Sequence, residues 1–191
     1  MSLLQARGLT RHFGGLRAVD GVDFDLEAGE IHALIGPNGA GKTTFVSLLS
    51  GRLAPQAGTI RLAGEDITRT PAHIRVRKGV AYTFQITSIF PGLSVFDNVA
   101  LAAQGARVRD LKAAVQAALS RVGMAGMAAE VAGVLSYGHQ RLLELAMGLA
   151  LAPRVLILDE PTQGLAAGEF EGFKALVRSL VPQVAVLLME H

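Results

Sequence analysis

The chain has 191 residues, of which half are hydrophobic and 18% are charged, and its formal net charge is +2. This length can bury the core of one domain, and so small a charge gives no argument for a nucleic-acid partner. The absence of cysteine excludes a disulfide framework and thiolate metal sites. The start of the chain lacks a signal-peptide core. The longest clean apolar run, about eight residues over 145–152, is too short for a membrane span.

The amino-terminal third predicts a small antiparallel sheet. The segments "LLQARGLTRHF" and "GVDFDLEAGEI" read as two strands, the second with alternating apolar residues at Val22, Phe24 and Leu26. The later segment "GTIRLAGEDI" predicts another strand and a turn. Thr70 and Pro71 then indicate the start of a short helix, with threonine as the cap and proline in the first helical position.

A phosphate-binding loop is predicted between a strand and a helix. The apolar run Ile31–Ile35 suits a strand buried on both faces, and the helix is expected from Thr43 to Ser50, ending at Gly51. The turn between them, "GPNGAGKT" over 36–43, matches the P-loop pattern G-x-x-x-x-G-K-[ST] at every fixed position. The alternative is a plain glycine-rich turn, which the flanking strand and helix disfavour.

The chemistry of a P-loop explains why these residue types are needed. Glycines let the backbone curl so that successive N–H groups face the phosphates, and the helix N-terminus adds a favourable dipole. Lys42 is expected to reach the β- and γ-phosphates and to assist catalysis, and the Thr43 hydroxyl is expected to hold Mg²⁺. The predicted phosphate-binding residues are Gly36, Pro37, Asn38, Gly39, Ala40, Gly41, Lys42, Thr43 and Thr44.

The second half of the chain predicts a helical insertion between core strands. A strand is expected over 80–84, ending at Gln85. Ser94 then caps "VFDNVALAAQ", apolar residues of "VRDLKAAVQAALSRVG" recur at helical spacing, and a third helix begins near Ser136. The segments "RVLILDEP" and "QVAVLLMEH" predict two more buried strands.

The run "VLILDE" is an apolar strand that ends in two carboxylates. Asp159 is expected to bind Mg²⁺, directly or through water, and Glu160 to polarise the attacking water as a general base. On its own such a run could be an ordinary strand end. Downstream of a P-loop it predicts the second half of a phosphoryl-transfer site.

The order of these motifs resembles that of the ATP-binding subunits of ABC transporters. Gln85 in "TFQ" resembles the glutamine that touches Mg²⁺ and the attacking water in this family. "LSYGHQ" stands where the family has its "LSGGQ" signature, and "LLMEH" ends in His191 at the position of the switch histidine that contacts the γ-phosphate. The resemblance also implies that Phe13 stacks on adenine. Outside that resemblance, Gln85 could be a polar strand end, Phe13 a packing residue and His191 a frayed terminus.

The resemblance implies an α/β fold with a P-loop NTPase (RecA-like) core. The core and its antiparallel β subdomain are expected over 1–85 and 147–191, and a helical subdomain carrying the signature over 86–146. The implied cofactors are ATP and Mg²⁺. Ser136 and Gly138 would bind the ATP of a second ATPase subunit, identical or not, in a head-to-tail dimer.

Further partners follow from the same resemblance. The helical subdomain, beginning "ITSIFPGL", is expected to receive a helix of an integral membrane permease. A substrate-binding protein would be an indirect partner, nucleic acid is not expected, and the expected location is peripheral, at the cytoplasmic face of the cell membrane.

The residues around Gln85 and the signature are similar to those of ATPases that import branched-chain amino acids. Importers of urea or short-chain amides, a non-hydrolytic or regulatory nucleotide-binding module, and a soluble ABC ATPase remain alternatives. Two features depart from the family pattern. Ala166 stands at the position of the D-loop aspartate, and the sequence stops at His191, where the family continues, so we expect a missing tail.

Overall fold

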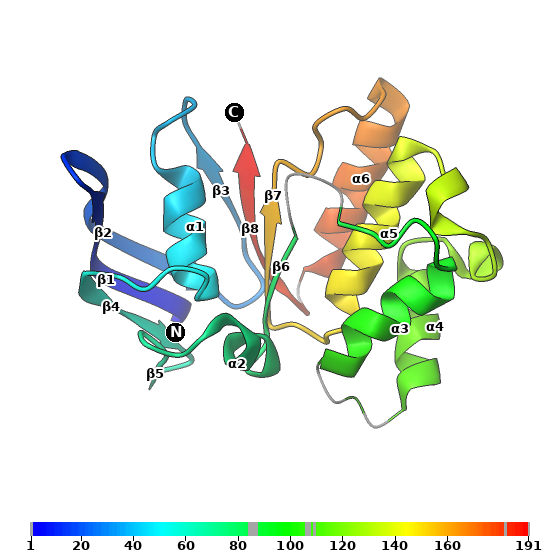
Figure 1. The fold of residues 1–191 in the computed structure, drawn as a ribbon, viewed down its shortest axis with the longest axis horizontal. Coiled ribbons are helices and arrows are strands. Elements are labelled where there is room, and N and C mark those ends of the chain that lie inside the picture. Colours follow the sequence, from blue (N-terminus) through cyan, green and yellow to red (C-terminus); the bar gives the residue numbers. More distant parts are fainter. Residues whose placement is uncertain (1, 84–87, 106–107, 109, 182, 191) are drawn as a thin grey trace.

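Two sheets and the helices around them form the molecule (Figure 1). The computed structural model describes residues 2–83, 88–105, 108, 110–181 and 183–190. One sheet has the strand order β2-β1-β4-β5 and the other has the order β3-β8-β7-β6. Helix α1 (Lys42–Ser50) lies between the sheets, whereas α3 to α6 lie on the other side of the second sheet. This arrangement confirms the predicted α/β fold class.

The first sheet is the antiparallel one that the sequence predicts. Its central strand β1 (Ser2–Phe13) pairs with β2 (Leu16–Glu27) on one side and with β4 (Ala57–Leu62) on the other, and β4 pairs with the short β5 (Glu65–Asp66). Its buried face packs on α1 because apolar residues of both elements share one hydrophobic cluster.

The second sheet is parallel and separates two hydrophobic cores. It consists of β3 (Ile31–Ile35), β6 (Val80–Tyr82), β7 (Val155–Asp159) and β8 (Ala185–Glu190). Successive side chains of a strand point to opposite faces, so Val155 and Ile157 join the core around α1, whereas Leu156 and Leu158 join the helical core. The expectation of two buried strands here is confirmed.

The predicted burial of β3 on both faces is wrong. The strand exists, but it is the edge of the parallel sheet, and Ile31 and Ile35 are 37% and 71% exposed. An apolar run alone does not reveal its place in the strand order, and an edge strand has a neighbour on only one side.

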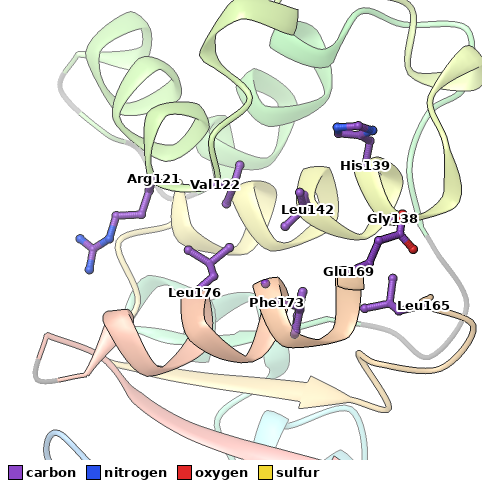
Figure 2. Close-up of a pocket in the computed structure, with 10 residues that line it drawn as sticks. Arg121, Val122, Gly138, His139, Leu142, Leu165, Glu169, Phe173 and Leu176 are labelled. Atoms are coloured by element: carbon purple, nitrogen blue, oxygen red, sulfur yellow. The ribbon is translucent and has the colours of Figure 1, made fainter. Parts of the chain in front are cut away.

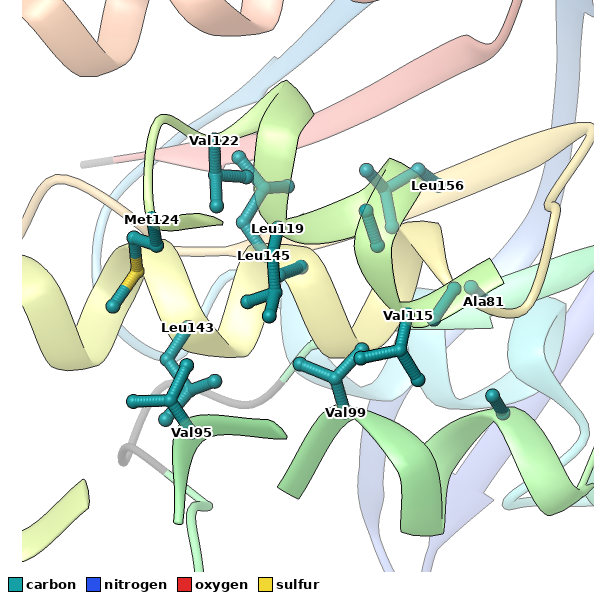
Figure 3. Packing of buried hydrophobic residues seen from close by; sticks show 14 of the residues in the cluster. Ala81, Val95, Val99, Val115, Leu119, Val122, Met124, Leu143, Leu145 and Leu156 are labelled. Carbon is teal, nitrogen blue, oxygen red and sulfur yellow. The ribbon is translucent and has the colours of Figure 1, made fainter. Parts of the chain in front are cut away.

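The helices α3 (Val95–Gly105), α4 (Leu111–Arg121) and α5 (Tyr137–Leu149) follow β6 as predicted, and Figure 3 shows the core that they share. Ser94 caps α3 by accepting from the Asp97 N–H at 3.0 Å, and Asp110 caps α4 by accepting from the Ala113 N–H at 2.9 Å. Short 3₁₀ turns at Ala125–Met127 and Ala132–Val134 connect α4 to α5.

Two helices differ from the sequence prediction. The short helix α2 (Ala72–Arg77) starts one residue later than predicted, with Pro71 at the cap position. Helix α6 (Ala167–Leu180) is not among the predicted elements, although Phe173, Val177 and Leu180 are buried at helical spacing. Within the described residues, no helix is both long enough and apolar enough to cross a membrane.

Candidate nucleotide site

The P-loop folds into a tight curl that favours glycine at two positions. Gly39 and Gly41 have φ values of +79° and +86°, in the left-handed region. A Cβ atom added at Gly41 would lie 2.0 Å from the carbonyl oxygen of Ala18 on β2. Helix α1 then begins at Lys42, and Gly51 ends it with φ +79°, as predicted. The N–H groups of the first turn of α1 therefore open next to this loop.

Lys42 lies folded over its own loop. Its side chain is largely buried, and Nζ donates to the carbonyl oxygens of Gly36 and Pro37, the latter at 3.1 Å. The positive charge is thus held at the centre of the curl, where an anion would bind.

A cleft of about 270 Å³ joins several of the predicted residues. It is lined by Phe13, Leu16, Ala18, Asn38, Gly39, Ala40, Gly41, Lys42, Thr43, Thr44 and Glu160. The structure therefore brings the end of β1, the P-loop and the residue after β7 to one place. Leu16 and Ala18 are lining residues that the sequence did not single out. No motif marks them, and only their closeness to Phe13 across a short turn could have suggested them.

Phe13 has an exposed ring at one end of the cleft. The side chain is 44% exposed, and the Arg11 guanidinium lies 5.0 Å from the ring centroid. An exposed aromatic ring beside a P-loop offers a stacking surface for a base.

Asp159 ends β7 as a buried carboxylate. It is 3% exposed, and its Oδ2 accepts a hydrogen bond from the Tyr82 hydroxyl at 2.5 Å. Burial raises the pKa of Asp159, and the neighbouring Glu160 adds to the rise, whereas the Tyr82 hydrogen bond opposes it. Burial and the same hydrogen bond raise the pKa of Tyr82.

Glu160 turns the chain out of the strand. Its φ of +44° lies in the left-handed region, which is costly for a residue with a side chain. Its N–H donates to the Met189 carbonyl on β8 at 3.1 Å, which fixes this turn. As a result Glu160 lines the cleft with Thr43, although Asp159 and Glu160 are adjacent in sequence.

The signature segment forms the start of α5, away from this cleft. Ser136 is its N-cap, and its Oγ accepts from the His139 N–H at 3.3 Å and lies 2.8 Å from His139 Nδ1. Gly138 is buried beside Glu169. A Cβ atom added at Gly138 would lie 2.2 Å from Glu169 Oε1, so this carboxylate fills the space that a side chain would need. Neither Ser136 nor Gly138 lines the P-loop cleft, so the structure does not bring them to the chain's own nucleotide site.

A second cavity, of about 380 Å³, lies between α5, α6 and the end of α4 (Figure 2). Its lining is Arg121, Val122, Gly138, His139, Leu142, Leu165, Glu169, Gly172, Phe173 and Leu176. Glu169 Oε2 also accepts from the Ala166 N–H at 3.0 Å, so this carboxylate caps α6 next to the D-loop position.

Gln85 and His191 lie outside the described residues.

Comparison with known proteins gives matches over most of the chain. The family model described as "ABC transporter" matches residues 19–163. The branched-chain amino acid transport ATP-binding protein BraF of Pseudomonas aeruginosa is 39% identical over 99% of this chain and 82% of its own length. A ribose import ATP-binding protein of Streptomyces coelicolor is 37% identical over 99% of this chain, which covers only 38% of that relative.

Solved structures agree on the fold. A nucleotide-free ATP-binding cassette from an ABC transporter superposes with a TM-score of 0.91 at 24% identity, covering all of this chain and 82% of the other. The structure of cbiO1 from Clostridium perfringens, part of the ABC transporter complex cbiONQ, has a TM-score of 0.89 at 26% identity, covering all of this chain and 78% of the other. The chain therefore belongs to the ABC transporter family, whose ATP-binding subunits are ATPases that use ATP with Mg²⁺, work as dimers and attach to membrane permeases at the cytoplasmic face.

Proposed function

We propose that the chain is the ATP-hydrolysing subunit of an ABC importer for branched-chain or related amino acids. The observation that carries the proposal is the cleft, in which Phe13, the P-loop and Glu160 meet. This combination offers a base-stacking ring, a phosphate cradle and a carboxylate, which are the parts that nucleotide hydrolysis needs.

The P-loop and Phe13 would bind the nucleotide. The curled backbone at Gly39 and Gly41 turns N–H groups toward the phosphates, and Lys42 supplies a positive charge already held by the loop. Phe13 would stack on the base from the end of β1. The remaining loop residues, Gly36, Pro37, Asn38, Ala40 and Thr44, would shape the cradle.

Oxygen donors in and beside the cleft suit Mg²⁺, although Asp159 itself does not line the cleft. A hydroxyl at Thr43 and a buried carboxylate at Asp159 are hard oxygen donors, and Mg²⁺ favours one or two such protein ligands together with phosphate oxygens. When bound, Mg²⁺ would neutralise charge on the transferring phosphate. Glu160, held beside the cleft by its left-handed backbone, would orient and deprotonate the attacking water. Gln85 and His191 keep the roles that the family resemblance implies.

The signature segment would serve the partner's nucleotide. Ser136 and the Gly138 backbone lie at the N-terminus of α5 and do not line the chain's own P-loop cleft. A second subunit in head-to-tail arrangement would bring such a segment over each γ-phosphate and exclude water. The helical subdomain, for which we propose the range 86–146, would take the permease contact, and a substrate-binding protein would deliver the cargo.

Amino acids are the favoured cargo because BraF matches over most of its own length as well as that of this chain. Sugar import is the second candidate, since ribose import proteins are 35–37% identical to the chain. Binding of the chain to permeases encoded beside it, followed by transport assays with leucine and ribose in vesicles, would separate the two.

Glu160→Gln tests the hydrolytic role. The substitution keeps the size of the side chain but removes the base, so ATP and Mg²⁺ should bind and close a dimer that cannot reopen by hydrolysis. We expect a dimer on size-exclusion chromatography with ATP and a loss of turnover of about 100-fold or more. An unchanged monomer that still hydrolyses ATP at the wild-type rate would contradict the proposal.

A further inference from the structure

The hydroxyl of Tyr82 is bound to the carboxylate of Asp159. It donates to Oδ2 at 2.5 Å, from the end of one parallel strand to the end of its neighbour. Oδ2 is therefore occupied by a strong donor, and Oδ1 is the carboxylate oxygen that this bond leaves for another ligand. The nucleotide-site motifs of the sequence do not include Tyr82.

Several contacts hold Tyr82 in place. Its backbone pairs with Ile157 in the parallel ladder, and the next residue, Thr83, donates its N–H to the Ile157 carbonyl at 2.9 Å. The guanidinium of Arg52, just beyond the end of α1, lies 4.9 Å from the ring centroid. The ring is thus fixed between the end of the P-loop helix and the end of β7, so its hydroxyl has a defined direction.

We propose that Tyr82 is a positioning residue that orients Asp159 for Mg²⁺. The inference depends on the proposed function, in which Asp159 holds the metal. Carboxylates that bind metals are commonly oriented by outer hydrogen-bond partners, and loss of such a partner costs about 10- to 100-fold in metal affinity. The Tyr82 hydroxyl fixes the rotation of the Asp159 carboxylate and leaves its second oxygen as the one that would bind the metal.

The experiment measures how strongly Mg²⁺ improves binding of AMP-PNP, a non-hydrolysable ATP analogue. Isothermal titration calorimetry gives the AMP-PNP dissociation constant in Mg²⁺ and in EDTA, and their ratio is the metal enhancement. Tyr82→Phe removes only the hydroxyl and keeps the ring. Ser179→Ala is the control, because it also removes a hydroxyl, from an exposed residue near the end of α6 that lines neither the P-loop cleft nor the cavity beside α5.

We expect the enhancement to fall about tenfold in Tyr82→Phe. The dissociation constant in EDTA should stay unchanged, because the cradle itself is intact, and Ser179→Ala should keep the wild-type enhancement. An unchanged enhancement in Tyr82→Phe would overturn the inference. So would equal weakening in Mg²⁺ and in EDTA, since that pattern indicates a general structural defect.

Asp159→Asn separates failure of this inference from failure of the proposed function. If Asp159→Asn loses the enhancement and Tyr82→Phe keeps it, Asp159 holds the metal without help from Tyr82, and the inference alone is wrong. If Asp159→Asn keeps the full enhancement, the assignment of Mg²⁺ to Asp159 is wrong, and the inference fails with it.

Discussion

Gly41 meets the strictest requirement that the structure places on a single residue. Its backbone is left-handed, and the carbonyl oxygen of Ala18 occupies the place of a side chain. Gly39 shares the left-handed backbone but has open space around it, with nothing within 4 Å of an added Cβ. A substitution at Gly39 therefore measures the free-energy cost of a left-handed backbone alone, whereas one at Gly41 adds the cost of a steric clash with Ala18.

Gly41→Ala and Gly39→Ala make this separation measurable. Gly39→Ala should cost about 1–2 kcal/mol, the usual price of a left-handed alanine. Gly41→Ala should cost more than about 3 kcal/mol, because either β2 or the P-loop must move to admit the methyl group. Urea denaturation followed by circular dichroism gives both values. Equal losses would show that the contact with Ala18 relaxes freely.

At the scale of elements, α2 holds the end of the P-loop helix through one buried arginine. Arg75 is 1% exposed and donates to the Leu48 and Leu49 carbonyls at 2.8 and 2.7 Å, which are among the last of α1. It also donates to the Thr68 and Thr70 carbonyls. Burial lowers the pKa of Arg75 to about 10, yet it stays charged at neutral pH. Its guanidinium supplies donors to carbonyls at the helix end, where the Leu48 carbonyl also accepts from the Gly51 N–H at 3.2 Å.

Arg75→Met should destabilise the protein by about 3 kcal/mol, because it removes the buried hydrogen bonds from the guanidinium to the Leu48, Leu49, Thr68 and Thr70 carbonyls. The matched control is Arg77→Met on the exposed side of the same helix, expected within about 0.5 kcal/mol of the wild type. Chemical denaturation gives the free energy of unfolding of the two variants and the wild type. A loss at Arg75 no larger than at Arg77 would mean that water replaces the guanidinium.

At the scale of the whole molecule, the two halves of the proposed site open in different places. The P-loop cleft and the start of α5 have separate linings, with no described residue in common. Tyr137 joins the α5 segment to the D-loop, since its ring lies against Gly164 and its hydroxyl accepts from Arg141 Nε at 3.1 Å. One chain therefore offers two incomplete surfaces that a dimer would combine.

Mixing two inactive variants tests this arrangement. Lys42→Ala disables the P-loop, and Ser136→Glu places a charge where the partner's phosphate would bind. Mixed dimers contain one site built from the two intact halves. We expect ATP turnover in the mixture that neither variant shows alone, measured by phosphate release. A mixture as inactive as its components would argue against a site shared between subunits.

Local sequence patterns predict much of this fold. The P-loop glycines, the Ser94 cap and the alternation in β2 are local signals in the sequence. The structure confirms the elements that they predict. The exposed edge position of β3 was not predictable in this way, because strand order depends on pairing with β8, which follows more than 140 residues later. The cleft residues Leu16 and Ala18 were missed because no motif marks them, although they follow Phe13 across a short turn.

Two further features were not predicted: helix α6 and the hydrogen bond between Tyr82 and Asp159. The spacing of Phe173, Val177 and Leu180 indicates α6, but no motif draws attention to it. The hydrogen bond between Tyr82 and Asp159 depends on β6 lying beside β7, and neither residue type alone implies it. The roles of the predicted site residues stay predictions, including those of Gln85 and His191.

The exposed edge of β3 has a practical consequence for handling the protein. One side of this strand has no partner among the described strands, and Ile35 leaves most of its side chain in water. Unprotected, apolar edges pair readily with strands of other molecules, and natural proteins usually cover or charge them. In concentrated samples this edge is therefore the first place to look for aggregation.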